Sequence, residues 1–163
     1  REAFPPSGIS DHNLTVTHKR RQELNTVWNY PCREQPGSLF IPAEDRHPQS
    51  QDAWLAPGVP LLGCKTIEGI RLFNQASYRV LTIDPLTIAS EGGEEGGREI
   101  EVDPKSFHGL LRLGYAQTYL SAQGKTCVGT VGLHECAHPC FTAKHLRTGL
   151  SRATSTELIS MTF

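Results

Sequence analysis

The sequence predicts an α/β fold in which a parallel sheet carries helices on both faces. Residues 13–17 (NLTVT) alternate β-branched side chains and predict a strand, and residues 18–30 follow with apolar side chains at helical spacing. After Pro104 the same alternation of strand and helix continues to the end of the sequence. Such alternation favours parallel pairing, because each crossover helix covers one face of the sheet.

Composition limits the classes of protein that fit. At 163 residues the chain suits one domain, and a net charge of -1 gives no overall attraction to nucleic acid or membrane. Five cysteines favour a reducing, intracellular compartment. No apolar run approaches the roughly 18 residues that span a bilayer. We expect a soluble protein without a membrane partner, with the nucleus or a viral replication site as candidate locations.

The opening residues (REAFPPSG) lack a methionine, so we expect residues 1–163 to be a fragment of a longer protein. Within it, Pro31 ends the first helix. A β-rich insertion is predicted at about residues 56–106, and the segment before it looks irregular because it is rich in proline. The expected parts are an irregular excursion at 32–60, strands at 59–64 and 78–84, and a hairpin with arms 86–89 and 98–102 around an acidic, glycine-rich tip at 91–97.

The last third is expected to contain most of the chemistry. Its second helix is amphipathic, with Phe141, His145, Leu146 and Leu150 as the predicted inward positions. The predicted elements are a strand near 111–116, a helix from about Thr118, a strand at 127–133, a helix at 142–150 and a strand at 157–163.

Gly124, Lys125 and Thr126 look like the end of a phosphate-binding loop of the Walker A type. That loop needs a glycine five positions before the second one, where this chain has Tyr119. It also needs a helix after the Lys-Thr pair, whereas residues 127–133 (CVGTVGL) predict a buried strand. The sequence therefore has no evident primary ATP site.

Two groups of residues could contact phosphates. Arg152, next to Ser151 at the end of the predicted helix, could aim its planar charge at a phosphoryl group, or it could serve the helix dipole or a surface ion pair. Thr118, Gln123 and Gly124 could bind an anion at a helix terminus, or could be an ordinary helix cap and a terminal glycine.

Two further clusters have ordinary alternatives. The basic run His18 to Arg21 could be a solvated helix face. Residues 134–140 (HECAHPC) alternate histidine and cysteine, which are zinc ligands, but strict alternation points successive side chains to opposite sides of an extended segment. We therefore expect an ordinary loop and no metal.

Together these motifs resemble motifs V and VI of superfamily 1 DNA helicases, in the RecD, Dda and Pif-like branch that includes viral members. Gln123, Gly124, Phe141, Ser151 and Arg152 fit the family pattern. Residues 17–25 (THKRRQELN) are similar to the segment after motif III, and residues 59–80 are similar to a later strand-turn-strand stretch. Leu120 and Ser121 depart from the usual His-Lys, His18 replaces the usual Asn, and Gln75 replaces a glycine.

The resemblance implies that residues 1–163 are a second RecA-like domain with a small β-rich insertion. It makes Arg152 the arginine finger and puts Gln123, Gly124 and Ser151 beside the nucleotide. The partners would be an N-terminal RecA-like domain, which would hold most of ATP and Mg²⁺, and single-stranded DNA. The residues expected to contact DNA are Thr17, His18, Lys19 and Thr118. The alternative hypothesis is a non-catalytic RecA-like module that binds protein or RNA.

Overall fold

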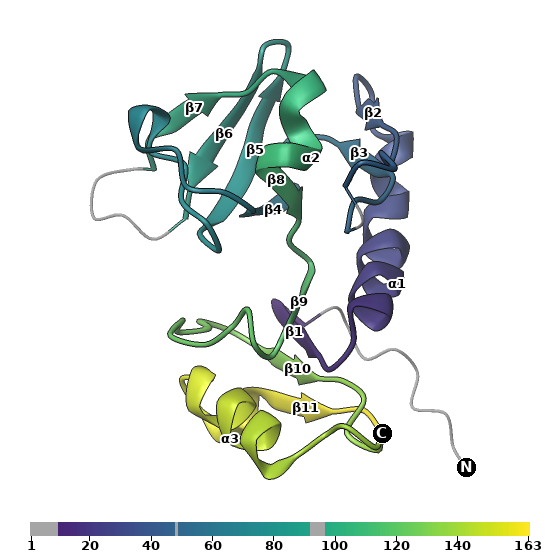
Figure 1. Ribbon diagram of the computed structural model, residues 1–163, viewed down its shortest axis with the longest axis vertical. Helices are drawn as coiled ribbons and strands as arrows, with labels where there is room; N and C mark the ends of the chain where they lie inside the picture. Colours follow the sequence, from purple (N-terminus) through teal and green to yellow (C-terminus); the bar gives the residue numbers. More distant parts are fainter. Residues whose placement is uncertain (1–9, 48, 92–96) are drawn as a thin grey trace. The chain divides into compact units, whose positions relative to one another are not determined.

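The computed structural model describes residues 10–47, 49–91 and 97–163 (Figure 1). They form two compact units, each described by itself below. The parallel-sheet unit combines the chain up to Arg21 with Ala116–Phe163, and the β-rich unit is Gln22–Tyr115. Helix α1 (His18–Asn29) begins in the first unit and continues into the second. None of the helices in the described ranges has the length and apolar character required to span a membrane.

The parallel-sheet unit is built on four strands, all paired in parallel. Its strands are β1 (His12–Thr15), β9 (Ala116–Thr118), β10 (Val131–Leu133) and β11 (Ile159–Met161), in the order β11-β10-β1-β9. The central strand β1 pairs Thr15 with Thr118 on one side and Leu14 with Leu133 on the other. The predicted α/β class with a parallel sheet is confirmed.

Helix α3 (Ala143–Arg152) packs on β10 in this unit (Figure 1). The two approach closely at Gly149, where an added Cβ would lie 2.5 Å from Cδ2 of the fully buried Leu133. Only glycine leaves room for the helix at this distance. The predicted inward position Leu150 is wrong, because its side chain is 44% exposed and Gly149 is the buried residue. A short 3₁₀ turn, η4 (Thr156–Leu158), connects α3 to β11.

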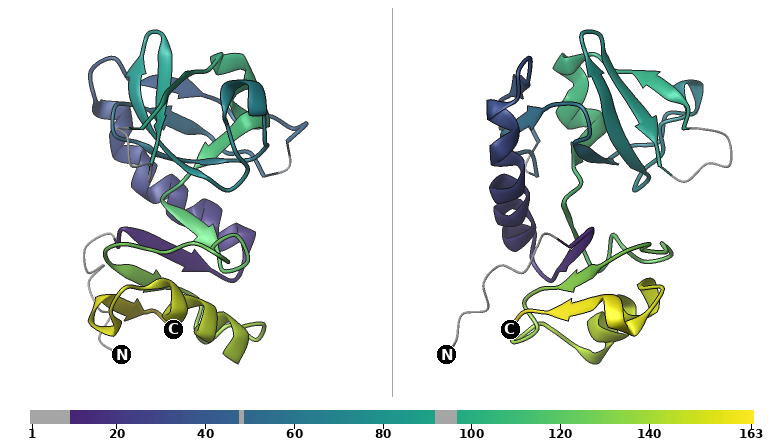
Figure 2. Two further views of the ribbon diagram at one scale, coloured as in Figure 1. Left: turned by 90° about the vertical axis from the view of Figure 1, so that its left-hand side faces the viewer. Right: turned by 180° about the vertical axis from the view of Figure 1, so that it is seen from behind.

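The β-rich unit contains an antiparallel sheet of five strands in the order β7-β6-β5-β4-β8. Figure 2 shows this unit from two further sides. Its fully buried core includes Leu55, Leu72, Tyr78, Ile88 and Leu111. The elements are η1 (Tyr30–Glu34), β2 (Leu39–Ile41), β3 (Ala53–Leu55), β4 (Pro60–Gly63), η2 (Glu68–Ile70), β5 (Ser77–Ile83), β6 (Leu86–Ser90), β7 (Glu99–Glu101), η3 (Pro104–Ser106), α2 (Phe107–Leu110) and β8 (Leu111–Leu113).

The predicted strands β4 and β5, the two hairpin arms and the helix α1 are confirmed, with α1 ending two residues before Pro31. Most of the predicted acidic tip, residues 92–96, lies outside the described residues. The prediction of an irregular segment at residues 32–60 is wrong in part, because β2 and β3 form a small antiparallel sheet there. Three-residue strands are too short to establish a period, so the prolines around them dominate the sequence pattern.

Two predicted strands of the last third are shorter than expected or divided. The strand near 111–116 is two strands in two sheets, β8 and β9, on either side of Gly114. The strand at 127–133 begins only at Val131, because Gly129 has a left-handed φ of 104° and turns the chain. An apolar composition alone could not indicate that Val128 would be 74% exposed.

Candidate nucleotide and nucleic-acid site

Arg152 ends α3 with its side chain half-buried and held at several points. Its Nη1 donates to the Lys125 carbonyl oxygen at 2.9 Å, while Nε and Nη2 lie 3.3 and 3.2 Å from Ser151 Oγ. The backbone is fixed as well, since Cys127 N donates to the Arg152 carbonyl at 2.8 Å. The guanidinium therefore lies against the chain two residues after Gln123.

The predicted helix from Thr118 is wrong. Thr118 is the last residue of β9, and a series of turns follows, with Ala122 N donating to Thr118 O at 3.1 Å. Tyr119 and Ala122 are buried in the core, whereas Leu120 is 73% exposed. The helical turn cannot continue because Gly124 adopts a left-handed φ of 81°.

This turn leaves Gln123 and Gly124 exposed. Apart from its two chain neighbours, no described residue has an atom within 4 Å of the place where a Cβ on Gly124 would stand, so the backbone there is open to approach. Gln123, Gly124, Ser151 and Arg152, which the sequence analysis assigns to the nucleotide, are thus adjacent in the structure. They lie close in sequence to Cys127 and Ala153, which form an isolated parallel bridge before β10 and β11 begin.

Lys125 is a member of this group that sequence reasoning missed. Its Nζ donates at 3.0 Å to Oε1 of Gln117, a side chain that is only 6% exposed in β9. Burial raises the pKa of the Cys127 thiol, and the charges of Lys125 and Arg152 oppose this rise. The positive charges of Lys125 and Arg152 therefore both lie close enough to Cys127 to influence its thiol. The Gly-Lys-Thr motif was the available signal, although it is not a Walker A loop.

The residues assigned to nucleic acid lie at the carboxyl ends of β1 and β9. Thr17 caps α1, because its Oγ1 accepts from Arg20 N at 3.1 Å. His18 and Lys19 are exposed on the first turn of the helix. Thr118 ends the neighbouring strand, is 7% exposed and contacts Ser121 Oγ at 3.0 Å. The structure thus gathers these four residues at one edge of the sheet and the nucleotide group elsewhere.

Glu135 holds the loop between β1 and α1. Its Oε2 accepts from the backbone N–H of Val16 at 2.7 Å and of Thr17 at 2.9 Å, and its Oε1 accepts from the Thr17 hydroxyl at 2.7 Å. Burial alone would raise the pKa of Glu135, but these hydrogen bonds outweigh it and lower the pKa below 4.5. Nothing in the local sequence identifies this contact, which joins residues 118 positions apart.

The alternating His/Cys run is divided among different structural contacts. His134 Nε2 lies 3.0 Å from Asn13 Oδ1, and Cys136 N donates to Thr162 O. Burial, with a smaller contribution from Arg20, lowers the pKa of His134 to about 4. Across the described residues, no three His, Cys, Asp or Glu side chains are grouped so that they could hold a metal ion.

No family model matches the chain, and no curated protein matches it either. Solved structures do. The crystal structure of a Bacteroides Pif1 bound to single-stranded DNA has a TM-score of 0.71 at 14% identity and covers 98% of this chain and 42% of that chain. Pif1 helicase from Candida albicans has a TM-score of 0.64 at 15% identity, with coverages of 99% and 47%.

A third structure, Pif1 helicase from Bacteroides in complex with ADP-AlF3 and single-stranded DNA, has a TM-score of 0.67 at 14% identity, with coverages of 99% and 43%. The chain thus spans less than half the length of each of these three chains. At such identities the likeness concerns the fold. The described residues have a fold that matches part of the Pif1 helicase structures.

Proposed function

We propose that the chain is the second RecA-like motor domain of an ATP-dependent DNA helicase in the RecD, Dda and Pif-like branch. One observation carries the proposal. Arg152 lies half-buried beside the exposed turn of Gln123 and Gly124, in a fold that matches Pif1 structures. A nucleotide bound by an N-terminal RecA-like domain would meet this face.

In this proposal Arg152 is the arginine finger. Its fork would stabilise the negative charge that develops on the γ-phosphate, and the bond to the Lys125 carbonyl would limit the positions of the side chain. Gln123, the open backbone of Gly124 and Ser151 would lie beside the nucleotide. Arg152 and Lys125 offer donors and positive charge, which suits phosphate oxygens and not a metal ion. Mg²⁺, with most of ATP, is therefore assigned to the N-terminal domain.

The single strand is assigned to the carboxyl-end edge of the sheet. Thr17, His18, Lys19 and Thr118 would contact its phosphates. The Thr17 hydroxyl already donates to Glu135. We therefore assign the main electrostatic contribution to DNA binding to Lys19, which is exposed on the first turn of α1. A DNA contact of this kind should weaken with salt, because bound counterions are released from the strand.

The test of the arginine finger joins this chain to its N-terminal RecA-like domain and measures ATP hydrolysis with and without single-stranded DNA. Arg152→Ala should lower turnover by about three orders of magnitude or more while nucleotide binding persists. Arg147→Ala, an exposed arginine of the same helix, is the matched control and should turn over normally. Unchanged turnover in the Arg152 variant would refute the role.

A salt titration of binding to single-stranded DNA tests the second half of the proposal. Affinity for single-stranded DNA should fall steeply with salt concentration. Lys19→Gln should reduce the slope of log affinity against log salt by the amount expected for about one phosphate contact. An absence of DNA binding, together with no DNA-stimulated hydrolysis, would instead favour the non-catalytic RecA-like module that binds protein or RNA.

A further inference from the structure

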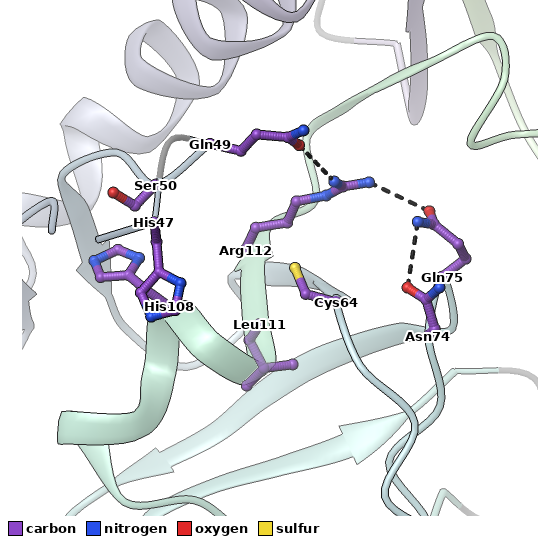
Figure 3. A pocket seen from close by; sticks show the side chains of 9 residues that line it. All are labelled: His47, Gln49, Ser50, Cys64, Asn74, Gln75, His108, Leu111 and Arg112. Carbon is purple, nitrogen blue, oxygen red and sulfur yellow. Dashed lines mark hydrogen bonds between the residues drawn. The ribbon is translucent and has the colours of Figure 1, made fainter. Parts of the chain in front are cut away.

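The β-rich unit contains a cavity of about 230 Å³ (Figure 3). Its walls come from the segment between β2 and β3, from the end of β4, from the loop before β5 and from the junction of α2 with β8. The volume is several times the roughly 30 Å³ share of a water molecule. It is smaller than the roughly 300 Å³ at which pockets for drug-sized ligands begin. The size suits a small ion or one group of a larger ligand.

Arg112 lies at the centre of the polar side of this cavity (Figure 3). Its Nη1 donates to Gln49 Oε1 at 3.4 Å, and its Nη2 donates to Gln75 Oε1 at 3.2 Å. Both distances are at or beyond the long end of the usual range for N–H···O bonds. Both acceptors are neutral amides, and an ionised acceptor forms a bond roughly twice as strong. An anion could therefore compete for the guanidinium.

The arginine also determines how the two amides face the cavity. Because Gln49 and Gln75 turn their Oε1 atoms to the guanidinium, their NH₂ groups point elsewhere as donors. Gln75 Nε2 lies 3.4 Å from Asn74 Oδ1, which leaves the Asn74 NH₂ as a further donor. Polar side chains from separate segments of the chain thus line one cavity.

Two imidazoles, those of His47 and His108, line the other side of the cavity (Figure 3). His108 Nε2 lies 2.8 Å from the Pro42 carbonyl, which can only accept, so this nitrogen carries its hydrogen. The carboxylate of Glu44 lies 3.8 Å from His47 Nε2 and is bonded to Arg46. Among the described residues that line the cavity itself, none is acidic.

We propose that this cavity binds a phosphate group, with Arg112 as its principal contact. The cavity combines a permanent positive charge with amide side chains from separate segments of the chain, which suits a tetrahedral anion better than a planar carboxylate. The phosphate is either inorganic phosphate or a backbone phosphate of a nucleic-acid strand. Only the second source rests on the proposed helicase function, so the site itself can be tested without any motor activity.

The first experiment titrates inorganic phosphate into the 163-residue chain and follows backbone and side-chain amide NMR signals at constant ionic strength. Changes should centre on Gln49, Gln75 and Arg112. Arg112→Gln should weaken the apparent affinity by about tenfold or more. The matched control is Arg79→Gln, because Arg79 lies in the same sheet but pairs with Glu91 outside the cavity.

The proposal would be overturned if phosphate left the cavity signals of the wild-type chain unchanged, or if acetate shifted them at the same concentrations. The wild-type titration gives this answer even if Arg112→Gln fails to fold. A second arm measures binding of oligo-dT against salt. A slope that becomes shallower by about 0.7 in Arg112→Gln identifies a DNA phosphate as the ligand. If the wild type binds phosphate and Arg112→Gln weakens that binding but leaves the salt slope for oligo-dT unchanged, the ligand is inorganic phosphate.

Discussion

Removing the Glu135 carboxylate should loosen the start of α1, and the structure allows the cost to be worked out. The carboxylate accepts three hydrogen bonds, from Val16 N, Thr17 N and the Thr17 hydroxyl. A hydrogen bond to a charged group contributes about 1.5–3 kcal/mol when it is buried. Here the side chain is half-exposed, so water replaces part of the loss, and losing a helix cap typically costs about 1–2 kcal/mol.

We therefore expect Glu135→Gln to destabilise the protein by about 1 kcal/mol and Glu135→Ala by about 2 kcal/mol. Glutamine keeps one acceptor oxygen, whereas alanine leaves all three donors without this partner. For a chain of this size each kcal/mol corresponds to a lower Tm of about 2–4 °C. Urea denaturation and calorimetry would measure both quantities. Glu157→Gln, a change at an exposed glutamate of the same unit, is the control and should be neutral.

The pH dependence separates this contact from a generic packing effect. The folded pKa of Glu135 lies below 4.5, so its stabilisation is present above that value and is lost as pH falls through the folded pKa. The difference between the wild type and Glu135→Gln should thus close as the pH falls through the lowered folded pKa of Glu135. A stability difference that stays constant as the pH is lowered below 4.5, or variants as stable as the wild type at neutral pH, would refute the reasoning.

Two other variants test the core of the same unit. Burial lowers the pKa of His134 to about 4 in the folded protein, below the ordinary value of 6.5. The free energy of unfolding should therefore be unaffected by this group above pH 6.5 and should fall between pH 6.5 and 4, by at most about 3 kcal/mol, because the unfolded chain gains the proton first. Urea midpoints measured across this range should decrease with falling pH in the wild type but not in His134→Gln. Gly149→Val should destabilise the protein by about 1–3 kcal/mol, measured by calorimetry, because its Cβ would stand 2.5 Å from Leu133 Cδ2. Adding Leu133→Ala should relieve the crowding, so the two destabilisations should be less than additive. Strict additivity would contradict the clash.

Local periodicity explains what could be predicted from the sequence. The β-branched alternation before His18 and the helical spacing after it specify β1 and α1, because both patterns repeat within a few residues. The change from strand to helix and back to strand at the end of the sequence, observed as β10, α3 and β11, likewise indicates the parallel sheet. The residue types at 123, 124, 151 and 152 also predict phosphate chemistry without any knowledge of the fold.

Only the tertiary structure decided how these pieces meet. A left-handed glycine at 124 and burial of Tyr119 and Ala122 replace the predicted helix by turns, since the core selects which side chains point inward. The contact of Arg152 with the Lys125 carbonyl, the three bonds to Glu135 and the cavity around Arg112 all join residues distant in sequence. Such contacts depend on chain closure and packing, which no local pattern of residues encodes.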